Sequence, residues 1–386
     1  MSSKATYDVA EQLIVGTLRS AVMKHGSEQV ASAIKHYLLE TGIAGKNILF
    51  FNFGRNALYS LFKQKFSGER VIFPAFICPT LVWAAVRAGV IPHFVDVSLE
   101  DFNMDIGLVS DKDIETSKAL FLNHTFGIPA DMDEIRARLT GRTYIIEDVA
   151  QALFARYRDK CVGTLGDSVL VSMYKQTPNI NGAILLTDSK LSEPSKSSLR
   201  AGDLARLLWL TSGPHDYMVR LLRQRRSISG QAGEVQRVED TRQPSALALR
   251  LFEEHLHGLK GLVDGKRAIA HYYRQRVEVS QYLIPQQVGT DKEPSWFNFS
   301  VRLVPEIAHI RDNLLATLRR RGIFCDHLWH DAPVAADVFK DYLTGDYPNA
   351  SLLAKSVINL PINADYREAD VDYLFDYIEG AIKRLV

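Results

Sequence analysis

Short apolar runs alternate with segments of helical spacing over the first half of this chain of 386 residues. Each apolar run is bounded by Gly, Pro or polar residues and is too short for a buried helix, so it reads as a strand. The predicted strands cover residues 48–53, 70–73, 91–95, 119–122, 144–146, 169–171 and 183–186. Strands and helices that alternate in this way form a mostly parallel sheet with helices on both faces. The sequence therefore predicts an α/β fold with a three-layer α/β/α large domain.

The second half of the chain has a different character. Residues 190–244 are rich in Arg and show no strand pattern, which indicates an insertion-like segment. A long helix is predicted over residues 245–282, after which strands and helices alternate again. We therefore expect a large domain over residues 1–245, with an N-terminal helical arm, and a smaller α+β domain over residues 246–386.

Composition narrows the possible functions. A formal net charge of +1 gives no electrostatic reason to expect nucleic-acid binding. The three cysteines lie far apart, without the spacing of a metal site or a disulfide framework, which favours a reducing compartment and no metal. The N-terminal residues lack the apolar core of a signal peptide, and no apolar run is long enough to span a bilayer. We expect a cytoplasmic protein that binds neither nucleic acid nor membranes.

Polar residues and turn residues follow several predicted strands where each one ends. Gly54, Pro74, His124, Asp148 and Ser172 all occupy such positions. In open α/β sheets, ligands bind outside the carboxyl ends of the parallel strands. These residues therefore predict a binding site along one edge of the sheet.

The stretch from residue 144 to residue 186 contains the residue types that pyridoxal phosphate (PLP) needs. Asp148 ends one strand and suits the pairing with the pyridinium nitrogen. Lys175 follows the next strand and suits the Schiff base. Gln151, three residues after Asp148, is placed to bond the ring oxygen.

A phosphate group needs backbone amides and hydroxyls. Gly54, Arg55 and Asn56 open a helix directly after a strand, which suits phosphate binding by N–H groups. Ser172 offers a hydroxyl to the same phosphate.

Taken singly, these residues have more common explanations. A lone lysine on a loop is solvated in most proteins, and an aspartate at a strand end often caps the next helix. A glycine turn such as that at Gly54 often serves only the backbone, and a histidine such as His124 is more often structural. Only the ordered combination of residue types favours a cofactor site.

The chain resembles a known family, the sugar aminotransferases of the DegT/DnrJ/EryC1/StrS group, which have the aspartate aminotransferase-like (type I) PLP fold. The motifs that carry the resemblance are Gly54-Arg-Asn-Ala-Leu58, Val71-Ile-Phe-Pro-Ala-Phe-Ile-Cys-Pro-Thr80, Phe94-Val-Asp-Val97, Gly127-Ile-Pro-Ala-Asp-Met132, Glu147-Asp-Val-Ala-Gln151, Val162-Gly-Thr-Leu-Gly-Asp167 and Asn359-Leu-Pro-Ile362. Of these, Glu147 to Gln151 is the most specific. The resemblance covers nearly the whole chain.

The resemblance implies a role for each candidate residue. Asp148 would meet the pyridinium nitrogen, and Gln151 would meet the ring hydroxyl. Ser172 and the amides of Arg55 and Asn56 would hold the phosphate. Lys175 would carry the Schiff base.

The chain departs from the family at two places. Lys175 follows Ser172 by fewer residues than the family lysine usually does, although its distance to Gly182 fits. Cys78 stands where the family usually has the aromatic residue that stacks on PLP. Either Phe76 or Trp83 would then cover the ring instead, or the ring face is lined unusually.

The sequence thus predicts a PLP-dependent aminotransferase. The resemblance implies a homodimer with its active sites at the subunit interface, and an amino group passed from glutamate to a keto group of a nucleotide-linked sugar. The sugar substrate rests on this resemblance alone. Two alternatives stay open: a PLP-dependent dehydratase or transaminase acting on a non-sugar carbonyl, and a member without turnover that serves as a regulator or assembly partner.

Overall fold

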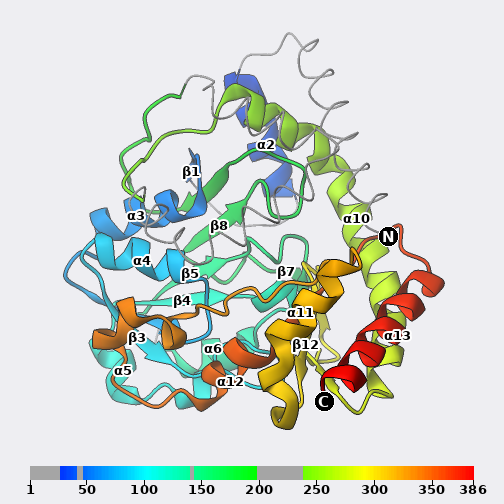
Figure 1. Ribbon diagram of the computed structural model, residues 1–386. Helices are drawn as coiled ribbons and strands as arrows, with labels where there is room; N and C mark the ends of the chain where they lie inside the picture. Colours follow the sequence, from blue (N-terminus) through cyan, green and yellow to red (C-terminus); the bar gives the residue numbers. More distant parts are fainter. Residues whose placement is uncertain (1–26, 41–46, 140–142, 198–237) are drawn as a thin grey trace.

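A computed structural model describes residues 27–40, 47–139, 143–197 and 238–386 of the chain (Figure 1). Its centre is a seven-stranded sheet with the strand order β1-β9-β8-β5-β4-β2-β3. These strands are β1 (Asn47–Phe51), β2 (Arg70–Pro74), β3 (Ile91–Val95), β4 (Ala119–Asn123), β5 (Tyr144–Asp148), β8 (Ser168–Ser172) and β9 (Ala183–Thr187). β9 runs antiparallel to both of its neighbours, and the other pairs are parallel. The prediction of a mostly parallel sheet is confirmed.

Helices cover both faces of this sheet, as a three-layer α/β/α arrangement requires. They are α2 (Ser27–Glu40), α3 (Gly54–Lys65), α4 (Pro79–Arg87), α5 (Asp111–Thr116), α6 (Met132–Arg138) and α10 (Ala246–Glu278). α3 and α4 pack on the face that carries Phe121, Ile146 and Leu170. The other helices pack on the opposite face, which carries Leu122 and Val169. Because successive side chains of a strand point to opposite faces, the apolar runs bury both sides of the sheet.

The C-terminal part is an α+β module with its own core. Its antiparallel sheet has the order β10-β12-β13. The elements are β10 (Leu283–Pro285), β12 (Phe299–Leu303), α11 (Arg311–Arg320), α12 (Pro348–Ser356), β13 (Val357–Leu360) and α13 (Glu368–Leu385). α13 packs against both α11 and α10, and all three helices contribute side chains to this core.

The two cores are less separate than the division at 245/246 suggests. α10 packs its first half on the large sheet through Phe252 and Leu256, and its second half on the small sheet through Tyr273 and Val277. Residues from Trp329 to Val357 also join the core beneath α3 and α4. The long helix, which Figure 1 shows running down one side of the molecule, therefore serves both cores.

A third, small sheet links the two parts. It joins β6 (Arg156–Tyr157), β7 (Lys160–Cys161) and β11 (Lys292–Glu293). The expected N-terminal arm before residue 27 and most of the 190–244 segment lie outside the described residues. Within the described ranges, no helix is long and apolar enough to cross a membrane.

Candidate active site

Three strands of the sheet end in polar side chains on the same face. β4 ends in Asn123, β5 in Asp148 and β8 in Ser172, and all three residues are buried. Asn123 and Asp148 are register partners. Alternation along each strand puts all three side chains on the face that α3 and α4 cover. Three neighbouring strands therefore end in polar side chains on one face, at the sheet edge predicted from the sequence.

The first turn of α3 is suited to bind an anion above this surface. Gly54 begins the helix beside β8, where an added Cβ would lie in van der Waals contact with the Leu170 side chain, at 3.4 Å. Phe53 at the N-cap position gives no side-chain cap, and the first turn has no acid. The Asn56 amide donates to the Phe53 carbonyl, so Gly54 and Arg55 are left as the first-turn donors for a ligand.

Arg55 adds a positive charge at the same place. Its guanidinium lies over the Phe53 ring, 4.2 Å from the centroid. Its Nε atom is buried and has no hydrogen-bond partner among the described residues. A cation at the positive end of a helix dipole is unfavourable unless an anion balances it. The Asn56 side chain, in contrast, is held by the Val238 carbonyl, 2.8 Å away.

Lys175 and Asp148 lie within electrostatic reach of each other at the strand ends. Burial raises the pKa of the Asp148 carboxyl above its ordinary value, and the charge of Lys175 opposes this rise. The Ala150 amide donates to Asp148 Oδ1 at 2.9 Å and fixes the carboxyl group. A buried acid whose charge depends on a nearby cation is suited to bind a cationic ring nitrogen.

The loop that carries Lys175 is short and well braced. It joins β8 to β9, and the Met173 amide donates to the Gly182 carbonyl at 3.0 Å. Gly182 has a φ of +119°, and an added Cβ would lie 2.6 Å from Met173 Sδ, so only glycine fits there. Thr177 Oγ1 donates to the Met173 carbonyl at 2.5 Å, and Asn179 Nδ2 donates to Ala248 of α10 at 2.9 Å. This bracing allows a shorter loop to hold its lysine in one place.

Gln151 is oriented by its neighbours. Its Oε1 accepts a hydrogen bond from the Phe126 amide at 3.0 Å, so its NH₂ group is the part left for a ligand oxygen. Ser295 of the C-terminal part donates to the Gln151 carbonyl at 2.8 Å and accepts from Gln176 Nε2 at 3.2 Å. The lysine loop, Gln151 and the C-terminal part thus meet in one hydrogen-bonded chain.

Phe76, one candidate for the cover of the ring, and Cys78, which stands at the family's stacking position, lie in different environments. Phe76 is fully buried, edge-on to Phe126 at 6.0 Å and to Trp329 at 5.4 Å. The ring of Phe76 thus packs among other aromatic side chains of the core. Cys78 is partly exposed at the N-cap of α4, with its Sγ 3.1 Å from Thr80 Oγ1. Cys78 is the one that we retain.

Sequence reasoning missed the pair of Glu147 and His124. Glu147 points to the opposite face from Asp148 and is fully buried. Since the Ala130 amide donates to His124 Nδ1 at 3.0 Å, the other ring nitrogen carries the proton and donates to Glu147 at 3.0 Å. The sequence does contain an indication of this role. An acid within a buried strand needs hydrogen-bond donors, and the glycine-rich loop 163–166 could supply backbone amides.

Glu147 fixes that loop directly. It accepts hydrogen bonds from the amides of Gly163 at 2.5 Å, Leu165 at 2.9 Å and Gly166 at 2.7 Å. Burial alone would raise the pKa of Glu147, but these bonds and His124 hold it below its ordinary value. The pair is therefore structural, beneath the strand end that carries Asp148.

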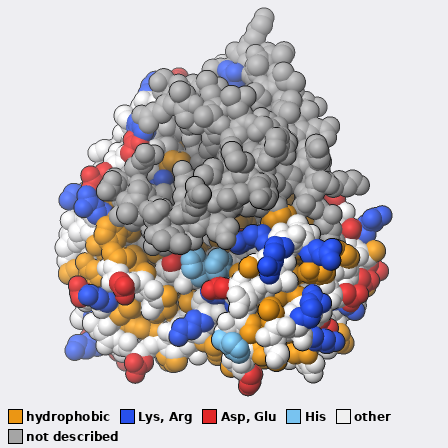
Figure 2. Space-filling view, in the orientation of Figure 1, with side chains coloured by type: hydrophobic (Ala, Val, Ile, Leu, Met, Phe, Trp, Pro, Cys, Tyr) orange, Lys and Arg blue, Asp and Glu red, His pale blue; other side chains and the backbone are white. Residues whose placement is uncertain are grey.

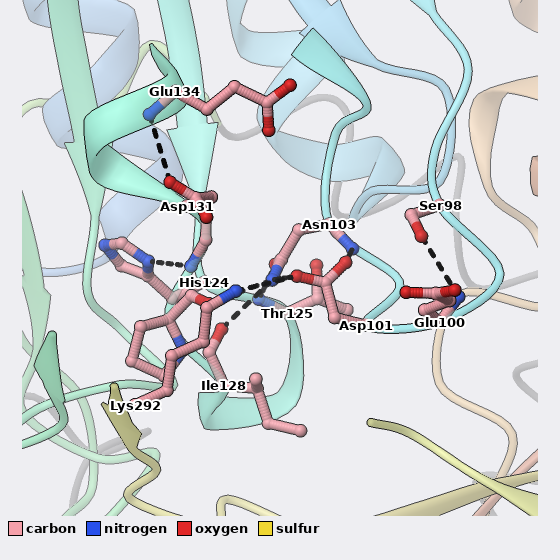
Figure 3. Close-up of polar contacts among 12 residues, drawn as sticks. Ser98, Glu100, Asp101, Asn103, His124, Thr125, Ile128, Asp131, Glu134 and Lys292 are labelled. Carbon is pink, nitrogen blue, oxygen red and sulfur yellow. Dashed lines mark hydrogen bonds and ion pairs between the residues drawn. The ribbon is translucent and has the colours of Figure 1, made fainter. Parts of the chain in front are cut away.

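A second polar network braces the turn after β4. Figure 3 shows Asn103 reaching Thr125 and Ile128 of this turn, with Lys292 paired to Asp101 beside it. The bond from the Thr125 amide to Asn103 Oδ1 is 2.8 Å long. This network and Glu147 together fix the turn that positions Gln151 through Phe126.

Replacing Glu147 with Gln is expected to destabilise the fold by about 3 kcal/mol, because several buried N–H donors lose a charged acceptor. Gln keeps the shape but turns an NH₂ group toward N–H donors. Chemical denaturation measures the change. Because the folded pKa is lowered, the stabilisation exists above the unfolded pKa and disappears as the pH falls through the folded value. The difference in the free energy of unfolding between wild type and E147Q should therefore be smaller at acid pH.

Glu134 gives a matched control. Its pKa is raised by burial and by the neighbouring acids Asp131, Asp105 and Asp101. Neutralising it should leave the fold as stable or slightly more stable at neutral pH. A loss of stability in E134Q as large as in E147Q would contradict the structural role given to Glu147.

Known proteins resemble this chain over most of its length. The model of the DegT/DnrJ/EryC1/StrS aminotransferase family matches residues 53–379. A pleiotropic regulatory protein of Geobacillus stearothermophilus is 28% identical over 81% of this chain and 78% of that protein. A dTDP-3-amino-3,4,6-trideoxy-alpha-D-glucose transaminase of Streptomyces venezuelae is 29% identical over 76% of this chain and 72% of that protein.

The fold is also that of a solved relative. The E. coli GDP-4-keto-6-deoxy-D-mannose-3-dehydratase with bound hydrated PLP superposes with a TM-score of 0.70 at 19% identity, over 96% of each chain. The predicted α/β fold of PLP-dependent enzymes is thereby confirmed. The family match spans both cores and the motifs that form the sheet edge. The chain belongs to the DegT/DnrJ/EryC1/StrS aminotransferase family.

Proposed function

We propose that this chain is a PLP-dependent aminotransferase that aminates a keto group of a nucleotide-linked sugar, with glutamate as donor. The observation that carries the proposal is the meeting of Asp148 and Lys175 at one sheet edge, beneath an uncapped helix N-terminus. Relatives with this fold include a sugar transaminase and a sugar dehydratase that binds PLP.

The residues at the sheet edge fit PLP. The amides of Gly54 and Arg55, the orphaned Nε of Arg55 and the hydroxyl of Ser172 would hold its phosphate. Asp148 would bind the ring nitrogen, and the NH₂ group of Gln151 would bind the ring oxygen. Cys78 would lie beside the ring. When bound, PLP supplies an electron sink for a carbanion next to the amino group.

The work of this chain is to place charges and move a proton. Burial raises the pKa of Asp148 and a nearby cation lowers it, so a cationic ring nitrogen would favour the ionised carboxyl group and would itself stay protonated. Lys175 would supply the amine that binds the cofactor covalently and, once released, would carry the substrate proton as base and then as acid. Its braced loop keeps this amine at the strand ends.

We further propose that the protein is a cytoplasmic homodimer with its active sites at the subunit interface.

The donor half-reaction tests the proposal. Cofactor-loaded protein is incubated with glutamate, and released 2-oxoglutarate is measured against protein concentration. One equivalent per site is expected, together with the spectral change to the amino form of the cofactor. Loss of water from a keto-sugar without 2-oxoglutarate would mark a dehydratase instead. Failure of the protein to bind PLP at all would leave the regulator as the surviving alternative.

A further inference from the structure

Asn123 ends β4 directly beside Asp148 and has one side-chain atom without a partner. The two residues are register partners in neighbouring parallel strands, and their side chains point to the same face of the sheet. Asn123 Nδ2 donates to Thr125 Oγ1 at 2.7 Å, whereas its Oδ1 is buried and accepts no hydrogen bond from any described residue. A buried amide oxygen without a donor is costly, so this atom needs a partner that the carboxyl group beside it could supply.

Solvent does not satisfy this pair of side chains. Many charged side chains lie on the surface in Figure 2, where they meet water, but Asn123 is 4% exposed and Asp148 is 7% exposed. Asp148 Oδ1 accepts a hydrogen bond from the Ala150 amide, and no described residue donates to its other oxygen. Each side chain therefore has one free polar position, and the strand register places the two side chains next to each other.

The protonation state of Asp148 decides which atom of Asn123 can bond to it. Burial raises the pKa of Asp148, while the charges of Lys175 and His124 oppose the rise. A protonated carboxyl group has an O–H donor, which suits the free Oδ1 of Asn123. An ionised carboxylate only accepts hydrogen bonds, so it needs the NH₂ group of the amide instead.

Thr125 allows the amide of Asn123 to turn over, because a hydroxyl group can both donate and accept. In the structure Thr125 Oγ1 accepts from Asn123 Nδ2, and after a half-turn of the amide it would donate to Oδ1. The Thr125 amide donates to Asn103 Oδ1 at 2.8 Å, as Figure 3 shows, and its carbonyl accepts from Gln286 Nε2 at 2.9 Å. This fixed backbone keeps the hydroxyl group within reach of either amide atom.

We propose that Asn123 is a positioning residue for Asp148: its amide oxygen accepts from the protonated carboxyl group, and after a half-turn its NH₂ group donates to the ionised one. Hydrogen bonds to a charged group are stronger than those to a neutral group, so Asn123 favours the ionised form on balance. The consequence for the cofactor rests on the proposed function. There the bond from Asn123 to the carboxylate helps to keep the proton on the ring nitrogen.

Asn123→Leu tests the pair without any cofactor. Leucine has a similar volume but neither donates nor accepts, so the ionised form of Asp148 should lose more than the protonated form. The pKa of Asp148 is expected to rise by about one unit relative to wild type, the difference between a charge-assisted and a neutral hydrogen bond. ¹³C NMR of the aspartate carboxyl carbons in the full chain measures the titration, and the D148N variant identifies the signal of Asp148.

Asn359→Leu is the matched control. Asn359 of β13 is also buried, at 2% exposed, but both polar atoms of its amide have partners, Ser300 and Asp326. N359L should lower the stability of the fold and leave the pKa of Asp148 unchanged. An equal rise of this pKa in N359L and N123L, or no rise in N123L, would overturn the proposal.

Asn123→Asp is the second variant if N123L does not fold, because it keeps the shape of the side chain. Two adjacent carboxyl groups cannot both ionise easily, so the new carboxyl group should titrate with a raised pKa. That pKa should fall when Asp148 is also replaced by asparagine. A new carboxyl group that titrates in the same way with and without Asp148 would show that the two side chains do not meet.

PLP labelled with ¹⁵N at the ring nitrogen extends the test to the loaded protein. In N123L the ¹⁵N chemical shift should move toward that of an unprotonated pyridine. The rate constant of the glutamate half-reaction should fall about 10-fold with an unchanged KM for glutamate, since one pKa unit corresponds to a factor of ten. A ring-nitrogen signal that is identical in N123L and wild type would refute the role of Asn123 at the cofactor.

The two proposals can fail separately. A raised pKa of Asp148 in cofactor-free N123L, together with a failure of the wild type to bind PLP, would support the pair of Asn123 and Asp148 and refute the aminotransferase. A complete glutamate half-reaction in the wild type, together with an unchanged pKa of Asp148 in N123L, would keep the aminotransferase and overturn the role of Asn123.

Discussion

Lys175→Ala is expected to lower the rate of the glutamate half-reaction by at least ~10²–10⁴-fold, the contribution of a positioned proton carrier. The variant should also lose covalent attachment of PLP, because the other polar residues near it in the loop carry no amine. Thr177 is already bonded to the Met173 carbonyl, and Gln176 is bonded to Ser295. Borohydride reduction followed by peptide mapping should place the pyridoxyl label on Lys175 in the wild type and on no residue in the variant.

Two further measurements make this result specific. A small primary amine added to K175A should restore part of the rate, since it can enter the volume that the side chain leaves and carry the proton. Lys190→Arg, on an exposed lysine at the far end of β9, should behave as wild type. A label on another lysine, or an active K175A without added amine, would show that the family lysine is elsewhere.

The strand ends could be predicted because they depend on local pattern. Each apolar run is bounded by turn residues, so β3 matches its predicted bounds of 91–95. Parallel strands then bring their carboxyl ends to one edge whatever the loops do. That rule predicted that Asp148 and Ser172 would lie at the same edge of the sheet.

Contacts that depend on distant loops could not be predicted. Glu147 is bonded to His124 and to amides 16 to 19 residues further along the chain, and no periodicity encodes that approach. From the sequence alone, Phe76 is a reasonable candidate to stack on the cofactor ring. Its burial depends on Trp329, which comes from the C-terminal part of the chain. The packing of residues 329–357 into the core of the large sheet likewise depends on tertiary contacts that no local pattern encodes.

Asp148→Asn is expected to have opposite effects on stability without and with the cofactor. Burial raises the folded pKa of Asp148 above the unfolded value, so the folded state binds the proton more tightly. This carboxyl therefore reduces stability as the pH rises through its folded pKa, and that loss persists at neutral pH. Cofactor-free D148N should accordingly be more stable than wild type at neutral pH and equally stable in acid. The asparagine keeps the acceptor for the Ala150 amide, so its packing is preserved.

With PLP bound the order should reverse. The cationic ring nitrogen compensates the buried charge of Asp148, whereas the neutral amide of D148N offers the ring no charge, so wild type gains more stability from the cofactor. The rate of the glutamate half-reaction should fall by about 10²–10³-fold, as for the removal of one preorganised electrostatic partner. Denaturant titrations of both proteins, with and without PLP, measure the reversal.

Asp167→Asn is the control variant. Asp167 accepts a hydrogen bond from the Ile145 amide at 2.8 Å, away from the sheet edge, so the effect of D167N on stability should not depend on the cofactor. If PLP stabilises D148N as much as wild type, Asp148 does not bind the ring nitrogen.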